Sequence, residues 1–178
     1  MRRRTMLGAV AAGVVSGAFG GVLRRRTGPE LGVTADPAPA GPPVTLSVDL
    51  LTGQTDADPA RLRVTFRSTA DGPRTVVAAY PFPFADRVGV ERESDAKLVL
   101  AYEAVGDRGD CWRTALPNVR PSVDRHAVAP GDRRSVEWSV LGHPGNDTCF
   151  PRGAYRFETT YEVDGTTFDW GFTVRVRN

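Results

Sequence analysis

The sequence has few of the side chains on which most chemistry at protein sites depends. Its 178 residues include two cysteines, two histidines and a single lysine, Lys97. Beyond the first 43 residues it has no G-x-S-x-G nucleophile motif, and neither cysteine has a C-x-x-C or C-x-H companion. These are the spacings of a hydrolase nucleophile elbow and of zinc sites. We therefore predict a protein without a catalytic centre, a metal or an organic cofactor.

Long helical patterns are missing as well. Glycine and proline, with 19 and 14 residues, make up about a fifth of the chain. No segment beyond residue 43 repeats its apolar residues every 3.6 positions, as an amphipathic helix does. The composition, 40% hydrophobic and 25% charged, is ordinary for a globular domain. It excludes a collagen, a coiled coil, a polytopic membrane protein and a fully disordered chain.

Basic charge is concentrated at the N-terminus. Residues 1–40 hold six of the 23 basic residues and two of the 21 acidic ones, which leaves residues 41–178 with 17 basic and 19 acidic side chains. A near-neutral domain lacks the electrostatic footprint of a nucleic-acid-binding protein, so we expect no nucleic-acid partner. The preference for arginine over lysine is typical of GC-rich genomes, such as those of haloarchaea and actinobacteria.

Residues 1–26 have the pattern of an export signal. Arg3 and Arg4 precede an uncharged run of 18 residues, 6–23, in which nine are glycine or alanine. A charged segment before a weakly apolar one is typical of signal peptides. The paired arginines resemble a twin-arginine (Tat) signal, which implies export of a folded protein. Two outcomes stay open. The signal is cleaved, near residues 38–40, or residues 6–23 remain as a single membrane anchor.

The remainder divides into a linker and one domain. Residues 27–43 contain five prolines and no apolar periodicity, which predicts a flexible or extended linker. From residue 44 the pattern changes to strict alternation of apolar and polar residues, which is typical of half-buried strands. We expect strands over residues 44–50, 61–67, 74–80, 97–102, 123–128, 135–141, 155–163 and 168–176.

These segments predict an all-β fold for residues 44–178. Asp164 and Gly165 join the last two strands, and an Asp-Gly pair favours a two-residue type I′ hairpin. Seven or eight short antiparallel strands joined by glycine and proline turns are typical of an immunoglobulin-like β-sandwich. The expected architecture is therefore a signal or anchor helix, a linker and one sandwich.

The last third resembles exported immunoglobulin-like domains. The resemblance is carried by Ala-Pro-Gly-Asp at 129–132, Ser-Val-Glu-Trp at 135–138 and Pro-x-Gly-x-Tyr at 151–155. One family with this combination is the intracellular proteinase inhibitor (BsuPI-like) family. The resemblance implies the sandwich fold and an inhibitory function. It transfers no binding residue position by position.

Cys111 and Cys149 are the two cysteines. In an exported domain, a pair of cysteines predicts one disulfide. Closing a loop of this length stabilises a fold by about 4 kcal/mol in the chain-entropy model. The alternative is two buried free thiols.

Three polar clusters are candidate sites. His126, His143 and Asp147 could hold a metal, but their spacing is not that of a ligand set, so ordinary surface or turn histidines are favoured. Asp107 and Asp110 lie three residues apart, and residues 108–110 spell the adhesion tripeptide Arg-Gly-Asp. An arginine between the acids favours a solvated loop over a calcium or acid–base site.

Two further features concern the surface. Tyr80, Phe82 and Phe84 alternate with prolines. We expect Phe82 and Phe84 to plug one end of the sandwich, and the alternative is an exposed, extended binding surface formed by the three aromatic residues. Asn146 begins an Asn-Asp-Thr sequon and is a candidate for N-glycosylation.

We therefore expect a non-catalytic, exported or membrane-tethered module at the cell surface, with an unknown protein or envelope component as its partner. It would contact a membrane through residues 6–23 alone, if these are not cleaved. The alternative is an exported inhibitor that uses residues 80–86 against a protease. An enzyme with a pocket that gathers His126 or His143 with acids is the third hypothesis.

Overall fold

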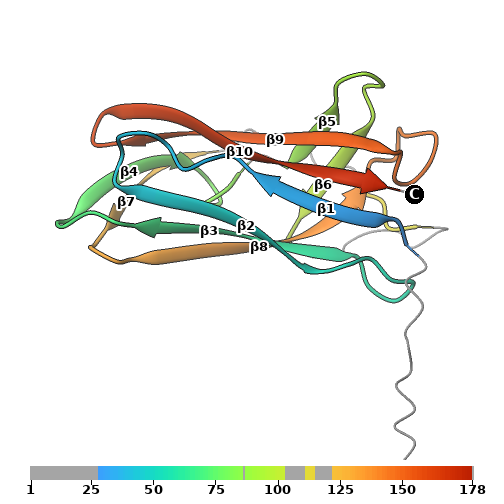
Figure 1. Cartoon of the computed structure of the whole chain (residues 1–178), viewed down its shortest axis with the longest axis horizontal. Helices are drawn as coiled ribbons and strands as arrows, with labels where there is room; N and C mark the ends of the chain where they lie inside the picture. Colours follow the sequence, from blue (N-terminus) through green and yellow to red (C-terminus); the bar gives the residue numbers. More distant parts are fainter. Residues whose placement is uncertain (1–27, 86, 103–110, 115–121, 178) are drawn as a thin grey trace, which may run out of the picture.

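The computed structural model describes residues 28–85, 87–102, 111–114 and 122–177, and this part of the chain forms ten strands and no helix (Figure 1). The all-β prediction is confirmed, and all eight expected strands are present. The two additional strands, β1 and β5, raise the number above the predicted seven or eight. The expected signal or anchor helix lies outside the described residues. The strands are β1 (Glu30–Ala35), β2 (Val44–Thr52), β3 (Ala60–Ser68), β4 (Arg74–Ala79), β5 (Val88–Glu91), β6 (Lys97–Ala101), β7 (Val123–Val128), β8 (Arg133–Gly142), β9 (Gly153–Val163) and β10 (Thr166–Arg177).

Strand β1 shows that part of residues 27–43, predicted to be a flexible or extended linker, belongs to the folded sheet. It pairs along its full length with β10, with Leu31 opposite Val176 and Val33 opposite Val174. Leu31 is buried in the core. Two apolar residues flanked by prolines are too short a pattern to reveal a strand. The free edge of β10 supplies the backbone partners, and only the folded domain provides that edge. The domain therefore begins before residue 44.

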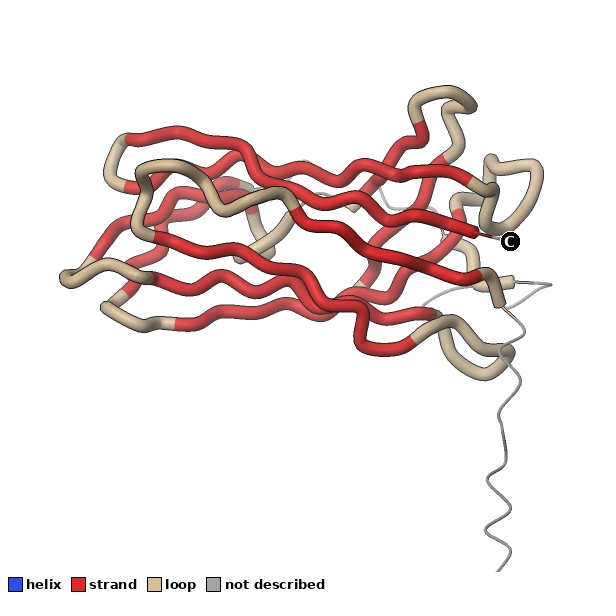
Figure 2. Tube along the Cα trace, in the orientation of Figure 1, coloured by secondary structure: helices blue, strands red, loops and turns tan. Residues whose placement is uncertain are grey.

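The strands form one antiparallel sheet that bends back over itself. Its order is β1-β10-β9-β5-β6-β8-β3-β2, and β4 pairs with both β9 and β7. Figure 1 shows β9 and β10 in one layer and β2, β3 and β8 in another, with β5 and β6 crossing between the layers. The two ends of the order, β1 and β2, lie in contact, so the sheet is nearly closed. Figure 2 shows that most loops lie at the two ends of the strands.

The core lies between the layers and follows from the alternation in each strand. The even-numbered residues of β3 and β8 face inward, and so do the odd-numbered residues of most of β9. Trp138 and Trp170 are buried, as expected of core residues. Burial raises the pKa of the Tyr161 hydroxyl, which donates a hydrogen bond to the carbonyl of Pro83. The largest fully buried side chains are Trp138, Trp170, Tyr155, Tyr161, Phe66, Phe84, Phe157 and Phe172.

The β9–β10 turn confirms the hairpin prediction. Asp164 and Gly165 have φ angles of 48° and 84°, the left-handed conformation that a type I′ turn needs at both positions. The Asp164 carboxylate accepts a hydrogen bond from the backbone N–H of Thr75 (3.1 Å) and pairs with Arg74 (3.2 Å). The turn therefore also holds the start of β4 against β9.

Candidate functional site

The predicted binding segment, residues 80–84, places its three aromatic side chains in different environments. Tyr80 is 60% exposed, Phe82 is half-buried and Phe84 is fully buried. The Phe84 ring lies 5.0 Å from that of Phe172 and 6.2 Å from that of Trp170. Phe84 therefore does not belong to an exposed surface, and it packs inside the domain as the favoured plug interpretation expects. The peptide bonds before Pro81 and Pro83 are both cis.

Phe82 and His126 form a stacked pair beneath this segment. Their ring centroids are 4.5 Å apart and the planes differ by 20°. Phe82 also contacts Phe66 of β3, at 5.0 Å. The Nε2 atom of His126 is buried and has no hydrogen-bond partner among the described residues. His126 thus serves as a packing residue between β7 and the core.

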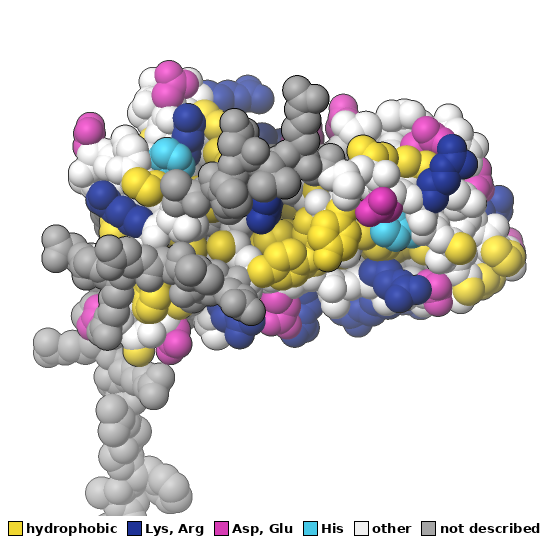
Figure 3. Space-filling model, turned by 180° about the vertical axis from the view of Figure 1, so that it is seen from behind, with side chains coloured by type: hydrophobic (Ala, Val, Ile, Leu, Met, Phe, Trp, Pro, Cys, Tyr) yellow, Lys and Arg dark blue, Asp and Glu magenta, His cyan; other side chains and the backbone are white. Residues whose placement is uncertain are grey.

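Tyr80 and Tyr102 form the exposed aromatic feature of the described part of the chain, which we call the tyrosine pair. Tyr102 is 47% exposed, and its ring lies 4.4 Å from that of the buried Trp138. Partial burial raises the pKa of Tyr102, and the nearby Tyr80 hydroxyl raises it further. Figure 3, which shows the molecule from behind, has hydrophobic side chains gathered in the middle of this face. Aromatic side chains that are exposed but backed by a rigid core are typical anchors in protein interfaces.

His126, His143 and Asp147, which were the alternative candidates for a metal site, do not form a cluster. His143 accepts a hydrogen bond at Nδ1 from the backbone N–H of Gly145 (3.0 Å) and closes its own loop, whereas His126 stacks on Phe82. Among the described residues, no group of three or more histidines, cysteines and acids lies close enough to hold a metal. Asp107, Asp110 and the tripeptide at 108–110 lie outside the described residues, as do Arg3 and Arg4.

Asn146, the sequon residue, ties its loop to β6. Its Oδ1 accepts from the backbone N–H of Lys97 (2.9 Å), and its Nδ2 donates to the carbonyl of the same residue (2.8 Å). Both polar groups of the amide are engaged in this clamp. The nitrogen that a glycan would modify is thus a structural hydrogen-bond donor. Glycosylation of Asn146 stays a prediction.

Cys111 and Cys149 form the predicted disulfide, with their Cα atoms 6.1 Å apart. The bridge fixes residues 111–114 beside the end of β8. There the N–H of Gly142 donates to the carbonyl of Trp112 (2.9 Å) and the N–H of Thr114 donates to the carbonyl of Gly142 (3.0 Å). A Cβ at Gly142 would collide with the carbonyl oxygen of Cys149, so this close approach requires glycine.

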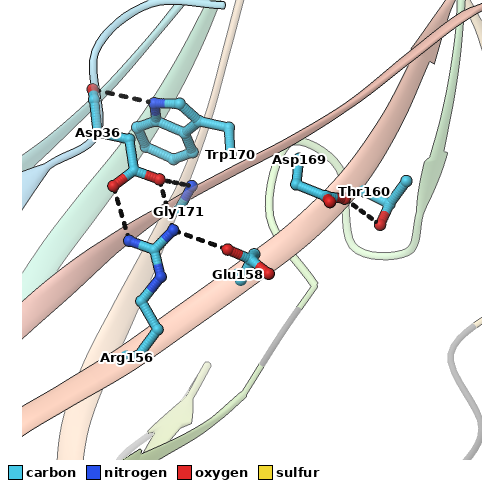
Figure 4. Close-up of polar contacts among 7 residues, drawn as sticks. All are labelled: Asp36, Arg156, Glu158, Thr160, Asp169, Trp170 and Gly171. Carbon is cyan, nitrogen blue, oxygen red and sulfur yellow. Dashed lines mark hydrogen bonds and ion pairs between the residues drawn. The ribbon is translucent and has the colours of Figure 1, made fainter.

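A polar cluster that the sequence analysis did not find lies at the end of β1 (Figure 4). The Asp36 carboxylate accepts two hydrogen bonds from the Arg156 guanidinium, one of 2.7 Å, and a third from the N–H of Gly171 (3.0 Å). Arg156 also donates to Glu158 (2.8 Å), and the indole N–H of Trp170 donates to the Asp36 carbonyl (3.3 Å). Asp36 and Arg156 are 120 residues apart, and no local pattern links them.

This cluster has a structural role. The hydrogen bonds from Arg156 lower the pKa of Asp36. Those same bonds and the contact with Glu158 raise the pKa of Arg156 above its ordinary value. A carboxylate held ionised by three donors is a poor proton acceptor for catalysis. The cluster therefore fixes the end of β1 on β9 and β10.

We expect Asp36→Asn to lower the free energy of unfolding by about 1–2 kcal/mol at neutral pH, because it weakens a charge-assisted, partly exposed pair. The folded-state pKa of Asp36 lies below the ordinary value of 3.8. Its contribution is thus fully present above that value and is lost as the pH falls through the folded-state pKa. Urea unfolding across this pH range should show the two proteins converging in acid. Asp147→Asn, at an exposed loop carboxylate, is the control. A difference that persists at the lowest pH would contradict the prediction.

Comparison with known protein families, with curated proteins and with solved structures gives no match to this chain. Among the described residues, no helix is long and apolar enough to cross a membrane.

Proposed function

We propose that the protein is a non-catalytic, exported or membrane-tethered module that binds a protein or envelope component through the tyrosine pair. The observation that carries the proposal is the exposure of Tyr80 and Tyr102, at 60% and 47%, on a face where Tyr102 packs on the buried Trp138. A tyrosine ring that already packs against the core loses little conformational freedom when it binds a partner, so more of its contact energy remains as affinity.

Two features support a location outside the cytoplasm. A structural disulfide between Cys111 and Cys149 is typical of oxidising compartments. The paired arginines Arg3 and Arg4 before an uncharged run are typical of a Tat-type signal. We propose that this segment either directs export and is removed or stays as an anchor.

For the fold, we propose an immunoglobulin-like sandwich. The arrangement of β9 and β10 over β2, β3 and β8 supports it (Figure 1). Membership of a BsuPI-like or similar exported family is part of the same proposal. The inhibitor hypothesis has less support, because burial of Phe84 leaves Tyr80 as the well-exposed aromatic side chain of residues 80–84.

Fractionation of the native host tests the location. Intact mass, with alkylation before and after reduction, should give either a soluble species without roughly the first 40 residues or a full-length species in membranes. In both cases the thiols should react only after reduction. A soluble full-length species with free thiols would refute the export proposal.

Substitution of the tyrosine pair tests the binding face. We expect Tyr80→Ala and Tyr102→Ala each to weaken binding to the host envelope fraction by at least about tenfold, as loss of an interface anchor does. The free energy of unfolding should change by less than about 1 kcal/mol for Tyr80→Ala. Leu51→Ala, at a 37% exposed residue of β2, is the control. Equal binding by all variants would refute the proposal.

A further inference from the structure

The outer surface of β2, β3 and β8 carries hydroxyl and guanidinium groups in register. Ser47, Thr65 and Ser135 are direct neighbours across the three strands. Two residues further along β3, Arg67 lies opposite Arg133. Residues two apart on a strand face the same side, about 7 Å from each other. The three hydroxyls and two guanidinium groups therefore form one surface, which we call the arginine–hydroxyl patch.

The charges of this patch are not balanced within the described part of the protein. Like charges directly opposite each other destabilise a strand pair, and neither Arg67 nor Arg133 forms an ion pair with any described residue. The nearest acid along β8, Glu137, already pairs with Arg61 (3.2 Å) and with Arg63. Two exposed guanidinium groups thus remain available for an external anion.

Thr65 gives a second, independent observation. It lies in the middle strand, between Arg63 and Arg67 of β3, and it is only 6% exposed. Its Oγ1 has no hydrogen-bond partner among the described residues. A buried, unpartnered hydroxyl costs stability, and native proteins seldom keep one without a reason. An anion bound at the patch would accept a hydrogen bond from this hydroxyl.

The donors fit a phosphoryl group. Guanidinium groups donate in a planar fork that matches phosphate oxygens, and the hydroxyls of Ser47, Thr65 and Ser135 add donors from the sheet below. We propose that the arginine–hydroxyl patch binds the phosphoryl groups of a linear phosphate polymer.

The shape of the surface favours a polymer over free phosphate. The patch is part of an open sheet face, where a single ion stays largely hydrated and binds weakly. A polymer places successive phosphoryl groups along the strands, so each further contact is intramolecular and adds affinity. Arg63 lies between the acids Asp49 and Glu137, whose negative charges repel phosphate. We therefore place the phosphate contacts at the other end of the face, at Arg67 and Arg133.

The test titrates the full-length chain, in a neutral detergent, with labelled inorganic polyphosphate at low ionic strength. We expect the double variant Arg67→Gln/Arg133→Gln to bind about 100-fold more weakly, since each hydrogen bond to a charged group contributes about tenfold. The control Arg152→Gln/Arg175→Gln removes two exposed charges from other parts of the protein and should bind within about twofold of the wild type. Thr65→Val should bind about fivefold more weakly while its unfolding midpoint stays the same or rises.

Four outcomes would overturn the proposal. The first is that the wild type does not bind polyphosphate, and the second is that the wild type and Arg67→Gln/Arg133→Gln bind it equally. The third is that the wild type binds poly-L-glutamate as tightly as polyphosphate, which would show attraction by charge alone. The fourth is competition by orthophosphate at equal phosphorus concentration, which would assign the patch to free phosphate. The tyrosine pair is not part of this patch, so none of these results bears on the proposed function.

Discussion

Replacing Phe84 with alanine should lower the free energy of unfolding by about 3–5 kcal/mol, the usual cost of removing a buried phenylalanine ring. Phe84 has no exposed surface and contacts Trp170 and Phe172. Its loss would leave a cavity beside these two rings, next to Pro83, whose carbonyl accepts a hydrogen bond from the Tyr161 hydroxyl. Equilibrium unfolding in urea, followed by tryptophan fluorescence, measures the effect.

Tyr80→Ala is the matched control, four residues away in the same segment. Because Tyr80 is 60% exposed, its truncation should cost less than about 1 kcal/mol. Phe84→Leu, which keeps most of the apolar volume, should fall between the two. A stable Phe84→Ala variant that loses binding to the envelope fraction would instead assign Phe84 to an exposed binding surface and contradict its packing role.

Removing the disulfide should cost nearly as much. The Cys111–Cys149 bridge closes a loop with a sequence separation of 38, for which the chain-entropy model gives about 4 kcal/mol. We expect Cys111→Ala/Cys149→Ala to lose about 3–4 kcal/mol in urea unfolding. The amide of Gly142, which donates to the Trp112 carbonyl, should exchange its hydrogen faster, because residues 111–114 are no longer fixed beside β8.

The wild-type protein under reducing conditions is the control for this variant, and it should show the same loss of stability. Amides of the β9–β10 hairpin far from the bridge, such as that of Phe168, should keep their relative protection. A loss below about 1 kcal/mol would show that residues 111–114 are held mainly by their backbone hydrogen bonds.

The strands with strict alternation were predictable, and the reason is local. Most of the expected segments have enough alternating residues to define one buried face, as in residues 155–163, where Tyr155, Phe157 and Tyr161 all enter the core. Strand β7 is the exception, because Val128 is its single buried residue. β1 and β5 were missed because six and four residues carry too little pattern. β1 pairs with the distant β10, and β5 pairs with the distant β9 as well as with its neighbour β6. A single sequence does not contain the information on the distant pairings.

The candidate site was predictable only in part. The sequence singled out residues 80–84 and favoured inward packing of Phe82 and Phe84, but it did not indicate that Phe84 is fully buried whereas Phe82 is only half-buried. The sequence did not indicate Tyr102 as a site residue. Tyr102 belongs to the site because β6 pairs with β8, where the Trp138 ring packs against the Tyr102 ring. The exposure of an aromatic side chain is set by what packs against it, and here those partners come from other strands.

Local patterns were enough to predict the all-β class and the Asp164–Gly165 hairpin, because period-two alternation and left-handed turn residues act within a few residues. The presence of two cysteines favoured the disulfide over two free thiols, and the structure contains the disulfide. The tertiary structure alone decided the addition of β1, the Asp36–Arg156 cluster and the alignment of Arg67 with Arg133. These depend on strand order and register, which are set by the packing of the whole sheet.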